Sequence, residues 1–196
     1  MLLNIIFIIL AYIIGSISSA ILVCKMNGLP DPRSQGSGNP GATNVLRIGG
    51  KGLAVTVLLL DTLKGIIPVI IAKLFGLSDL LIGCVALAAV IGHIYPLFFK
   101  FQGGKGVATA IGTFIAISWL LGLAFAITWL IVAAIFRYSS LAALVAIVLM
   151  PLYAIWLAGV GYIMPLLIIA ILTIYRHRTN IKRLCNKTEP KLGKKT

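Results

Sequence analysis

The chain has 196 residues, of which 60% are hydrophobic and 11% are charged, and its mean hydropathy is +1.10. Soluble domains carry about 25% charged residues, so this composition excludes an ordinary water-soluble core and predicts a single membrane domain over 1–196. The net charge of +13 raises the question of nucleic-acid binding. The basic residues border apolar runs, however, which favours a membrane topology signal and no nucleic-acid partner.

Seven apolar runs predict an all-α polytopic fold, because a membrane-spanning helix needs about 20 such residues. The first run has no Lys or Arg before it, so we interpret it as a span and not as a cleaved signal peptide. The uncharged run from Val107 to Phe136 is long for one helix, and we divide it at Gly122. The predicted spans are 2–24, 52–74, 79–99, 106–121, 122–136, 139–157 and 160–175.

The distribution of positive charge predicts the orientation of these spans. Of the 17 basic residues, Lys64 lies within a span and Lys73 near the opposite face, whereas all others fall on one side of the seven-span scheme. Positive charge marks the cytoplasmic face, so the N-terminus is expected outside and the basic tail, 176–196, in the cytoplasm. A six-span scheme would scatter the same charges over both faces.

Three polar segments on the predicted cytoplasmic side carry candidate anion ligands. The first, "GSGNPGATN" (36–44), combines glycines that permit left-handed backbone with side-chain donors, and Arg47 follows it. A flexible linker is the alternative for such a stretch, but the apolar-cationic "VLRIGG" after it favours an anion site formed partly by successive N–H groups. The candidate ligands here are Ser37, Gly38, Asn39, Thr43, Asn44 and Arg47.

The second segment, "FKFQGGKGVATAIG" (99–112), places Lys105 directly before an apolar helix, whose N-terminus favours anions. It lacks the first Gly and the final Ser/Thr of a nucleotide-binding P-loop, so phosphate binding without triphosphate chemistry is expected. The alternative is a plain cationic turn. The candidate ligands are Gly103, Gly104, Lys105 and Gly106.

The third segment, "RHRTNIKRLCNKTEPK" (176–191), begins where the last span leaves the membrane. His177 and Asn180 lie among its arginines, and His177 is a donor when protonated and a base when neutral. A positive-inside signal explains the arginines but not the histidine and the amide. Ser139 and Ser140, at the start of the sixth span, are expected to cap that helix, with substrate contact by Ser140 as the alternative.

Polar side chains inside the predicted spans form a supporting group. Asp61 and Lys64 stand one helical turn apart, and such costly charges are usually paired within a membrane. We therefore expect an ion pair between them, with His93 either bonded to Asp61 or lining a cavity. No spacing of His, Cys, Asp or Glu indicates a metal site, and no cofactor is expected.

Together the three motifs resemble those of the PlsY-type glycerol-3-phosphate acyltransferases, bacterial integral membrane enzymes that use acyl phosphate. The matching stretches are "GSGNPGATN" (36–44), "GHIYPLFFKFQGGKGVAT" (92–109) and "RHRTNIKRL" (176–184), in register over nearly the whole chain. Three departures are Ser18 in "GSISSA" (15–20), where a proline is expected, Gln102, where a lysine is usual, and Lys187, where the family pattern has glycine. The change at Lys187 leaves the fold of the tail open.

The resemblance implies transfer of a fatty acyl group to the 1-hydroxyl of glycerol 3-phosphate, giving lysophosphatidic acid and phosphate as a first step of phospholipid synthesis. It also implies a multi-pass protein of the bacterial inner membrane with a site facing the cytoplasm. Acyl phosphate and glycerol 3-phosphate would be its substrates, membrane lipid its surroundings, and the enzyme that makes acyl phosphate a contact partner. The residues it marks as catalytic are Arg47, Lys105, His177 and Asn180, with either His177 or a substrate phosphate as the base.

Two other classes of function are compatible with these patterns. A transporter of a phosphorylated solute or lipid would also need broken helices and anion-binding loops, although no inverted repeat is evident and the polar residues gather at one face. A non-catalytic scaffold subunit would tolerate substitutions in the glycine-rich segments.

Overall fold

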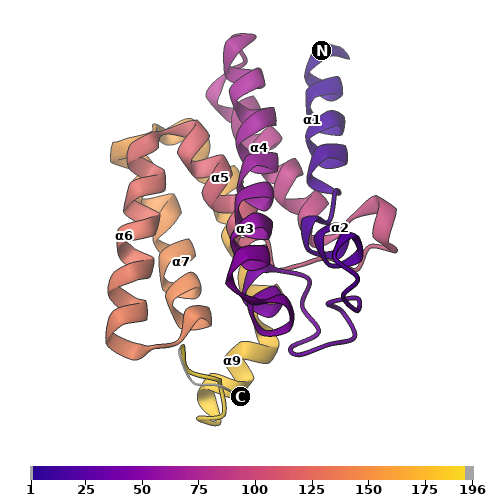
Figure 1. Cartoon of the computed structure of the whole chain (residues 1–196). Helices are drawn as coiled ribbons and strands as arrows, with labels where there is room; N and C mark the ends of the chain where they lie inside the picture. The colour runs from indigo at the N-terminus through magenta and orange to yellow at the C-terminus, as the bar shows by residue number, and fades with distance from the viewer. Residues whose placement is uncertain (1, 193–196) are drawn as a thin grey trace.

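A computed structural model of the chain describes residues 2–192 as an assembly of helices, drawn in Figure 1. Lys194 and Lys195 of the predicted basic tail lie outside these described residues. The helices are α1 (Leu2–Gly15), α2 (Ser19–Met26), α3 (Ala42–Leu74), α4 (Asp79–Ile94), α5 (Val107–Ile117), α6 (Trp119–Phe136), α7 (Ser139–Leu157), α8 (Ile163–Arg176) and α9 (Arg178–Cys185), with 3₁₀ turns η1 (Leu97–Phe99) and η2 (Val160–Tyr162).

Five helical segments of the described chain are long and apolar enough to cross a membrane. They become six if the stretch from η2 to α9, which bends by 59° between α8 and α9, counts as one span. The segment α5 is apolar but has 11 residues, which rise about 1.5 Å each and fall short of a bilayer core. The seven-span arrangement therefore stays a prediction.

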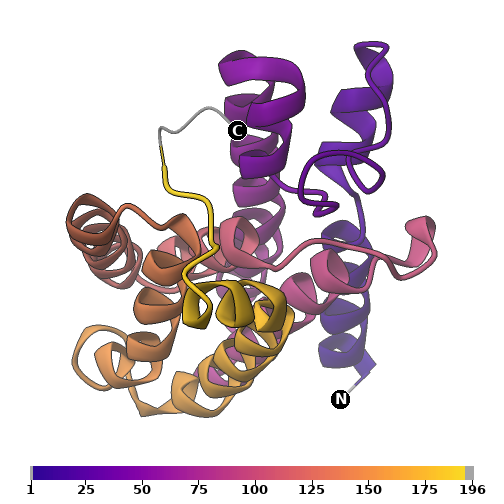
Figure 2. The ribbon, with the colours of Figure 1, turned by 90° about the horizontal axis from the view of Figure 1, so that it is seen from below.

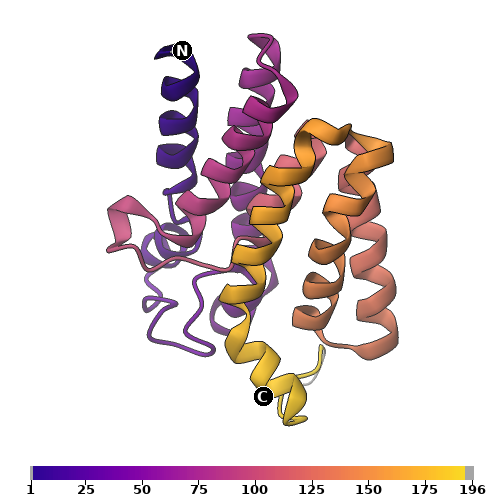
Figure 3. The ribbon, with the colours of Figure 1, turned by 180° about the vertical axis from the view of Figure 1, so that it is seen from behind.

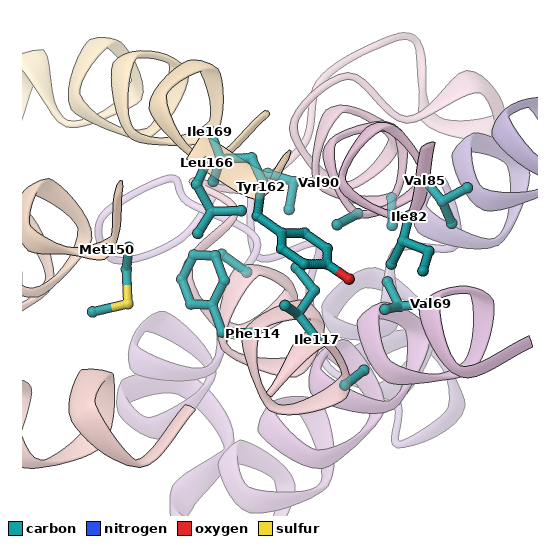
Figure 4. Close-up of a cluster of buried hydrophobic side chains, with 14 of the residues drawn as sticks. Val69, Ile82, Val85, Val90, Phe114, Ile117, Met150, Tyr162, Leu166 and Ile169 are labelled. Carbon is teal, nitrogen blue, oxygen red and sulfur yellow. The ribbon is translucent and has the colours of Figure 1, made fainter. Parts of the chain in front are cut away.

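The core of the protein is built around α4, which packs against α1, α3, α5 and α8. Figure 4 shows how buried side chains from different helices meet there, with Phe114 of α5 beside Tyr162 and Leu166. Outside this core, large apolar residues such as Leu130 and Ile171 are more than half exposed. An apolar exterior over several helices is the surface expected of a protein surrounded by lipid.

The break between α5 and α6 lies at Ser118 and not at Gly122, where we expected it. Ser118 has an extended backbone, with φ −151° and ψ 127°. Gly122 instead lies within α6, where a Cβ atom would come within 2.4 Å of Ile115 Cγ1, so this glycine allows α6 to pack closely on α5. Lys73 Nζ donates hydrogen bonds of 3.0 Å to the carbonyls of Ala116 and Ile117, which satisfies acceptors at the end of α5.

The first two predicted spans also differ from the observed helices. The stretch 2–24 is interrupted between α1 and α2, and the Ile17 carbonyl at this break accepts a hydrogen bond from Lys64 Nζ. Helix α3 begins at Ala42, ten residues before the predicted start, and kinks at Gly50, where φ is 81°. Because α3 starts this early, Thr43, Asn44 and Arg47 lie on a helix and not in the predicted loop.

The three polar segments approach one another at one end of the bundle. In Figure 1, α1 starts at the top and α9 lies at the bottom, and Figure 2 views the molecule from that lower end. Figure 3 shows the chain between η1 and α5 running inward beside α8. The tertiary fold therefore brings together segments that are far apart in the sequence.

Candidate active site

A cavity of about 500 Å³ lies where the three polar segments meet. Each segment contributes side chains that the sequence singled out, and the floor and walls come from α3, α4, α5, α6 and α7. The candidate residues that line it are Ser37, Asn39, Thr43, Asn44, Arg47, Asp61, His93, Lys105, Gly106, Ser140, His177 and Asn180. Four candidates do not line this cavity: Gly38, Lys64, Gly103 and Gly104.

Four helices start at the wall of this cavity. Its lining includes residues of the first turns of α3, α5, α7 and α9. The N-terminus of a helix carries partial positive charge and N–H groups without helical partners. The backbone therefore adds to the attraction of this cavity for anions, and the predicted position of Lys105 just before a helix is confirmed, because α5 starts two residues later.

Lys105 and Asn180 are in direct contact inside the cavity. Lys105 Nζ donates a hydrogen bond of 2.5 Å to Asn180 Oδ1, joining the second polar segment to the third. Burial lowers the pKa of Lys105 to about 8. The neighbouring charges that act on its pKa are Glu189, which opposes this shift, and Arg183, Arg176 and Arg47, which reinforce it.

His177 lies at the junction of α8 and α9 and is 3% exposed. Its Nδ1 is 2.7 Å from the Thr173 carbonyl, and because a carbonyl only accepts, this nitrogen carries the proton. Burial, reinforced by the charge of Lys105, lowers the pKa of His177 to about 4. The imidazole is therefore neutral at pH 7, with Nε2 as its acceptor.

The first polar segment is held by Asn44, which is 1% exposed. Asn44 Oδ1 accepts a hydrogen bond of 2.8 Å from the N–H of Ser37, and Asn44 Nδ2 donates to the carbonyls of Pro32 and Gln35. Both donors of this amide are thus used within the loop, which gives Asn44 a positioning role in place of the expected phosphate contact. The Gly38 N–H is likewise bonded to the Gln35 carbonyl, so the predicted row of free N–H groups is not formed there.

The glycines before Lys105 serve close packing. The N–H groups of Gly103 and Gly104 are bonded to the carbonyls of Ile94 and His93, at 3.2 Å each, so these two donors already have backbone partners. A Cβ atom on Gly104 would come within 2.2 Å of His93 Nε2. From the other side, Arg176 donates hydrogen bonds to the carbonyls of both glycines, and the backbone before Lys105 is clamped between α4 and α8.

The floor of the cavity holds the expected ion pair. Lys64 Nζ lies 2.8 Å from Asp61 Oδ1 and donates a 2.7 Å hydrogen bond to the Ile17 carbonyl. His93 Nδ1 is 3.6 Å from the same Asp61 oxygen, a separation too long for a strong hydrogen bond. This buried group connects α3, α4 and the break after α1 directly beneath the clamped glycines.

The sequence did not identify Glu189, which the fold places at the centre of the site. Its Oε1 accepts hydrogen bonds from Ser140 Oγ (2.6 Å) and Asn180 Nδ2 (2.7 Å), and its Oε2 accepts one from Arg183 Nε (2.7 Å). Burial disfavours the charged carboxylate, but these bonds outweigh it and lower the pKa of Glu189. The sequence feature that could have identified Glu189 is the scarcity of acidic residues. The chain has four of them, and Glu189 lies in an otherwise basic tail.

The tail reaches the cavity through a turn at Lys187. Lys187 adopts the left-handed conformation with φ 58°, and the N–H of Thr188 is bonded to the Arg183 carbonyl. The turn that the family pattern assigns to glycine is therefore made by lysine. Beyond it, Leu192 pairs with Arg137 at the start of the α6–α7 turn, and the tail covers one side of the cavity.

Ser139 and Ser140 do not cap α7. The residue at the cap is Tyr138, and no side chain caps this end of the helix. Ser140 Oγ instead donates to Glu189. The expected capping role is therefore wrong, because the returning tail provides a charged acceptor for this hydroxyl.

One wall of the cavity is apolar and was not predicted. It is formed where α3 and α6 both pack against the short helix α5, with α7 beside α6. The residues of this wall are Leu58, Ile111, Trp129 and Ala143. A cationic cup next to an apolar wall fits an amphiphile with a phosphate head and a hydrocarbon chain.

The fold and this site define a polytopic helical membrane protein with a cation-lined cavity beside an apolar wall. Comparison with known proteins identifies its family. The model of the family described as glycerol-3-phosphate acyltransferase matches residues 5–187. Relatives described as glycerol-3-phosphate acyltransferase include that of Francisella tularensis subsp. holarctica (strain OSU18), 55% identical over 98% of this chain and 95% of the relative, and that of Vibrio vulnificus (strain YJ016), 56% identical over 95% and 92%.

Solved structures give the same result. The crystal structure of PlsY, an integral membrane glycerol 3-phosphate acyltransferase, in its glycerol 3-phosphate form has a TM-score of 0.92 and 42% identity, covering 97% of this chain and 96% of that one. Its lysophosphatidic acid form has a TM-score of 0.90 and 41% identity, covering 97% and 95%. The chain belongs to the glycerol-3-phosphate acyltransferase family and has the integral membrane fold of PlsY.

Proposed function

We propose that this protein transfers a fatty acyl group from acyl phosphate to the 1-hydroxyl of glycerol 3-phosphate, releasing lysophosphatidic acid and phosphate. The observation that carries the proposal is the shared cavity. It places Lys105, Arg47 and Asn180, donors suited to two phosphorylated reactants, beside an apolar wall suited to an acyl chain. The relative solved in glycerol 3-phosphate and lysophosphatidic acid forms supports the acceptor and the product.

The chemistry needs little beyond positioning. Acyl phosphate is a mixed anhydride that already carries a good leaving group. The 1-hydroxyl oxygen attacks the acyl carbon, a new C–O bond forms, and the bond from that carbon to the phosphate oxygen breaks. Lys105, Arg47 and the helix N-termini offset the charge that develops on phosphate, and the cavity holds both reactants close together.

The hydroxyl proton goes to a phosphate oxygen in this mechanism. The alternative base, His177, is neutral, but its lowered pKa of about 4 makes it a weak proton acceptor. A phosphate monoester has its second pKa near about 6 and accepts the proton more readily. His177 Nε2 then serves to orient the glycerol hydroxyl by accepting its hydrogen bond. Since His177 Nδ1 contacts a backbone carbonyl, His177 lacks the carboxylate partner of a hydrolase triad.

The site faces the cytoplasm of the bacterial inner membrane, with seven spans and the N-terminus outside. The charge distribution supports this orientation, because basic residues of all three polar segments line the cavity or lie next to it in the sequence. The start of α1 and helix α9 lie at opposite ends in Figure 1, as an odd number of spans requires. A cytoplasmic site also allows contact with the enzyme that makes acyl phosphate.

One assay tests this function. The purified protein in detergent is given palmitoyl phosphate and glycerol 3-phosphate, and both phosphate release and lysophosphatidic acid are measured. Palmitoyl-CoA and palmitoyl-acyl carrier protein serve as donor controls and are expected to give no product. Turnover with a thioester donor but not with acyl phosphate would overturn the proposed donor. Counterflow of labelled glycerol 3-phosphate in liposomes without any acyl transfer would instead establish a transporter.

A further inference from the structure

We propose that Glu189 is a positioning residue for the reaction: through Asn180 it fixes the place of Lys105 and sustains the positive charge of that lysine. The inference rests on the proposed function in one respect, namely that protonated Lys105 binds phosphate. The inference assigns a role to Glu189, which follows α9 and lines the cavity. Glu189 contacts none of the proposed reacting atoms.

The hydrogen bonds determine which way the Asn180 amide points. A carboxylate oxygen only accepts hydrogen bonds and an ammonium only donates them. The Asn180 NH₂ must therefore face Glu189, at 2.7 Å, and its carbonyl oxygen must face Lys105, at 2.5 Å. With the carboxylate removed, the amide could rotate and turn its NH₂ group toward Lys105, where two donors would oppose each other.

The electrostatic surroundings of Lys105 make this acid necessary. Lys105 is flanked by cations from several elements: Arg47 from α3, Arg176 from α8 and Arg183 from α9. The neutral His177 also lies nearby and responds to the charge of Lys105. Among the described charges that act on Lys105, Glu189 is the one that favours its protonated form. A negative group at a phosphate site is otherwise unexpected, because it repels the ligand.

Glu189 is also well held, as a positioning residue must be. It has three charge-assisted or hydroxyl hydrogen bonds of 2.6 to 2.7 Å, and they come from α7 and α9. Charge-assisted bonds of this length are among the stronger ones in proteins. The tail is anchored again at Leu192, which pairs with Arg137. The carboxylate is thus fixed relative to both helices.

The test is the pH dependence of kcat/KM for glycerol 3-phosphate, which reports groups of the free enzyme. Activity is expected to fall above about pH 8, as Lys105 loses its proton. In Glu189→Gln this limb should move to lower pH by about half a unit or more, the size expected when a charge a few ångströms away is removed. In Arg183→Gln, which removes a cation and retains Glu189, the limb should move to higher pH.

Asp31→Asn is the matched control. Asp31 is also ion-paired with an arginine, Arg33, at 2.6 Å, but it does not line the cavity. Its substitution should leave the limb in place. Glu189→Gln and Arg183→Gln should shift the limb in opposite directions. A merely structural role of Glu189 would instead lower activity at every pH and leave the limb in place. Equal limbs in Glu189→Gln and the unmodified protein, or shifts of the same sign in both cavity variants, would overturn the inference.

Binding measurements separate this inference from the proposed reaction. Calorimetric titration with glycerol 3-phosphate at several pH values follows the same lysine without requiring acyl transfer. If Glu189→Gln does not fold, Arg183→Gln still decides the inference. In that variant, a basic limb at the same pH as in the unmodified protein, or at a lower pH, contradicts it. Absence of turnover with acyl phosphate together with the expected shifts in binding would overturn the reaction and leave the role of Glu189 standing.

Discussion

Lys105 and Asn180 are 75 residues apart in the sequence and form a hydrogen bond of 2.5 Å. The bond joins the glycine-rich segment before α5 to the first turn of α9, and it places a cation next to an amide at the centre of one cavity. A further hydrogen bond fixes each residue. Arg176 donates to the Gly104 carbonyl just before Lys105, and the Asn180 amide donates to Glu189. The site is therefore preorganised, and its parts can be tested one at a time.

Removal of either candidate phosphate-binding cation should abolish most of the activity. Lys105→Ala and Arg47→Ala are each expected to lower kcat/KM by about 10²-fold or more, the usual cost of losing a group that stabilises developing charge. Steady-state assays of phosphate release measure this effect. Lys182→Ala, an exposed cation on α9 that does not line the cavity, is the control and should retain activity. Near-normal turnover in both cavity variants would refute the phosphate-binding role.

Addition of a single methyl group at Gly104 should damage the site. In Gly104→Ala the new Cβ would lie 2.2 Å from His93 Nε2, and overpacking of this kind costs about 1–3 kcal/mol. Thermal unfolding in detergent should show a lower midpoint, and the displaced Lys105 should lower activity. Gly52→Ala meets no atom within 4 Å and should be neutral. A fully active, stable Gly104→Ala protein would contradict the observed contact.

The buried ion pair below the site should behave as a coupled unit. Asp61→Asn alone leaves Lys64 charged without its partner and is expected to destabilise the fold by about 3–5 kcal/mol. The double variant Asp61→Leu with Lys64→Met removes both charges and should lose less stability than either single change. A double-mutant cycle of unfolding free energies checks this coupling. Additive losses would show that the 2.8 Å contact contributes nothing to stability.

The acidic side of the pH profile should not depend on His177. Burial lowers the pKa of His177 from 6.5 to about 4, so this imidazole stays neutral until the pH approaches 4. Between those two values the unfolded chain takes up a proton that the folded protein does not, and the contribution of His177 to stability is lost as the pH falls. The acid limb of kcat/KM should instead follow the second ionisation of substrate phosphate, near about 6.

His177→Gln tests both statements. The acid limb should keep its position in this variant, and the loss of stability between pH 6.5 and 4 should become smaller. If kcat falls by about 10²–10⁴-fold with unchanged glycerol 3-phosphate binding, the range typical of a lost general base, the base is His177 and not the substrate.

The apolar wall should control use of the acyl donor. Ala143 is 4% exposed and lines the cavity, so Ala143→Phe is expected to obstruct the chain and raise KM for palmitoyl phosphate. The KM for glycerol 3-phosphate should change little, because Ala143 has no polar side-chain group and belongs to the apolar wall. Ala134→Phe, exposed on α6, is the control. An equal rise in both Michaelis constants would argue against an acyl site at this wall.

Much of this protein follows from its sequence, and the failures have specific causes. The apolar runs predict the helices, and the Asp61–Lys64 pair follows from their spacing, since three residues make about one turn. The sequence predicted the break between α5 and α6 at Gly122, but the break lies at Ser118. Gly122 is instead a packing glycine, and its neighbour Ile115 is known only from the fold. Asn44 and Gly103 were expected to touch substrate, but their polar groups are used within the protein.

The sequence by itself determined that the chain is a helical membrane protein whose apolar runs are separated by three polar, cation-rich segments, because composition and spacing act locally along the chain. Only the tertiary structure decided which of those groups share a cavity, how Asn180 is turned, and that Glu189 lies at the centre of the site. These depend on contacts between residues far apart in the chain, whose geometry is set by how the helices pack and not by any local pattern.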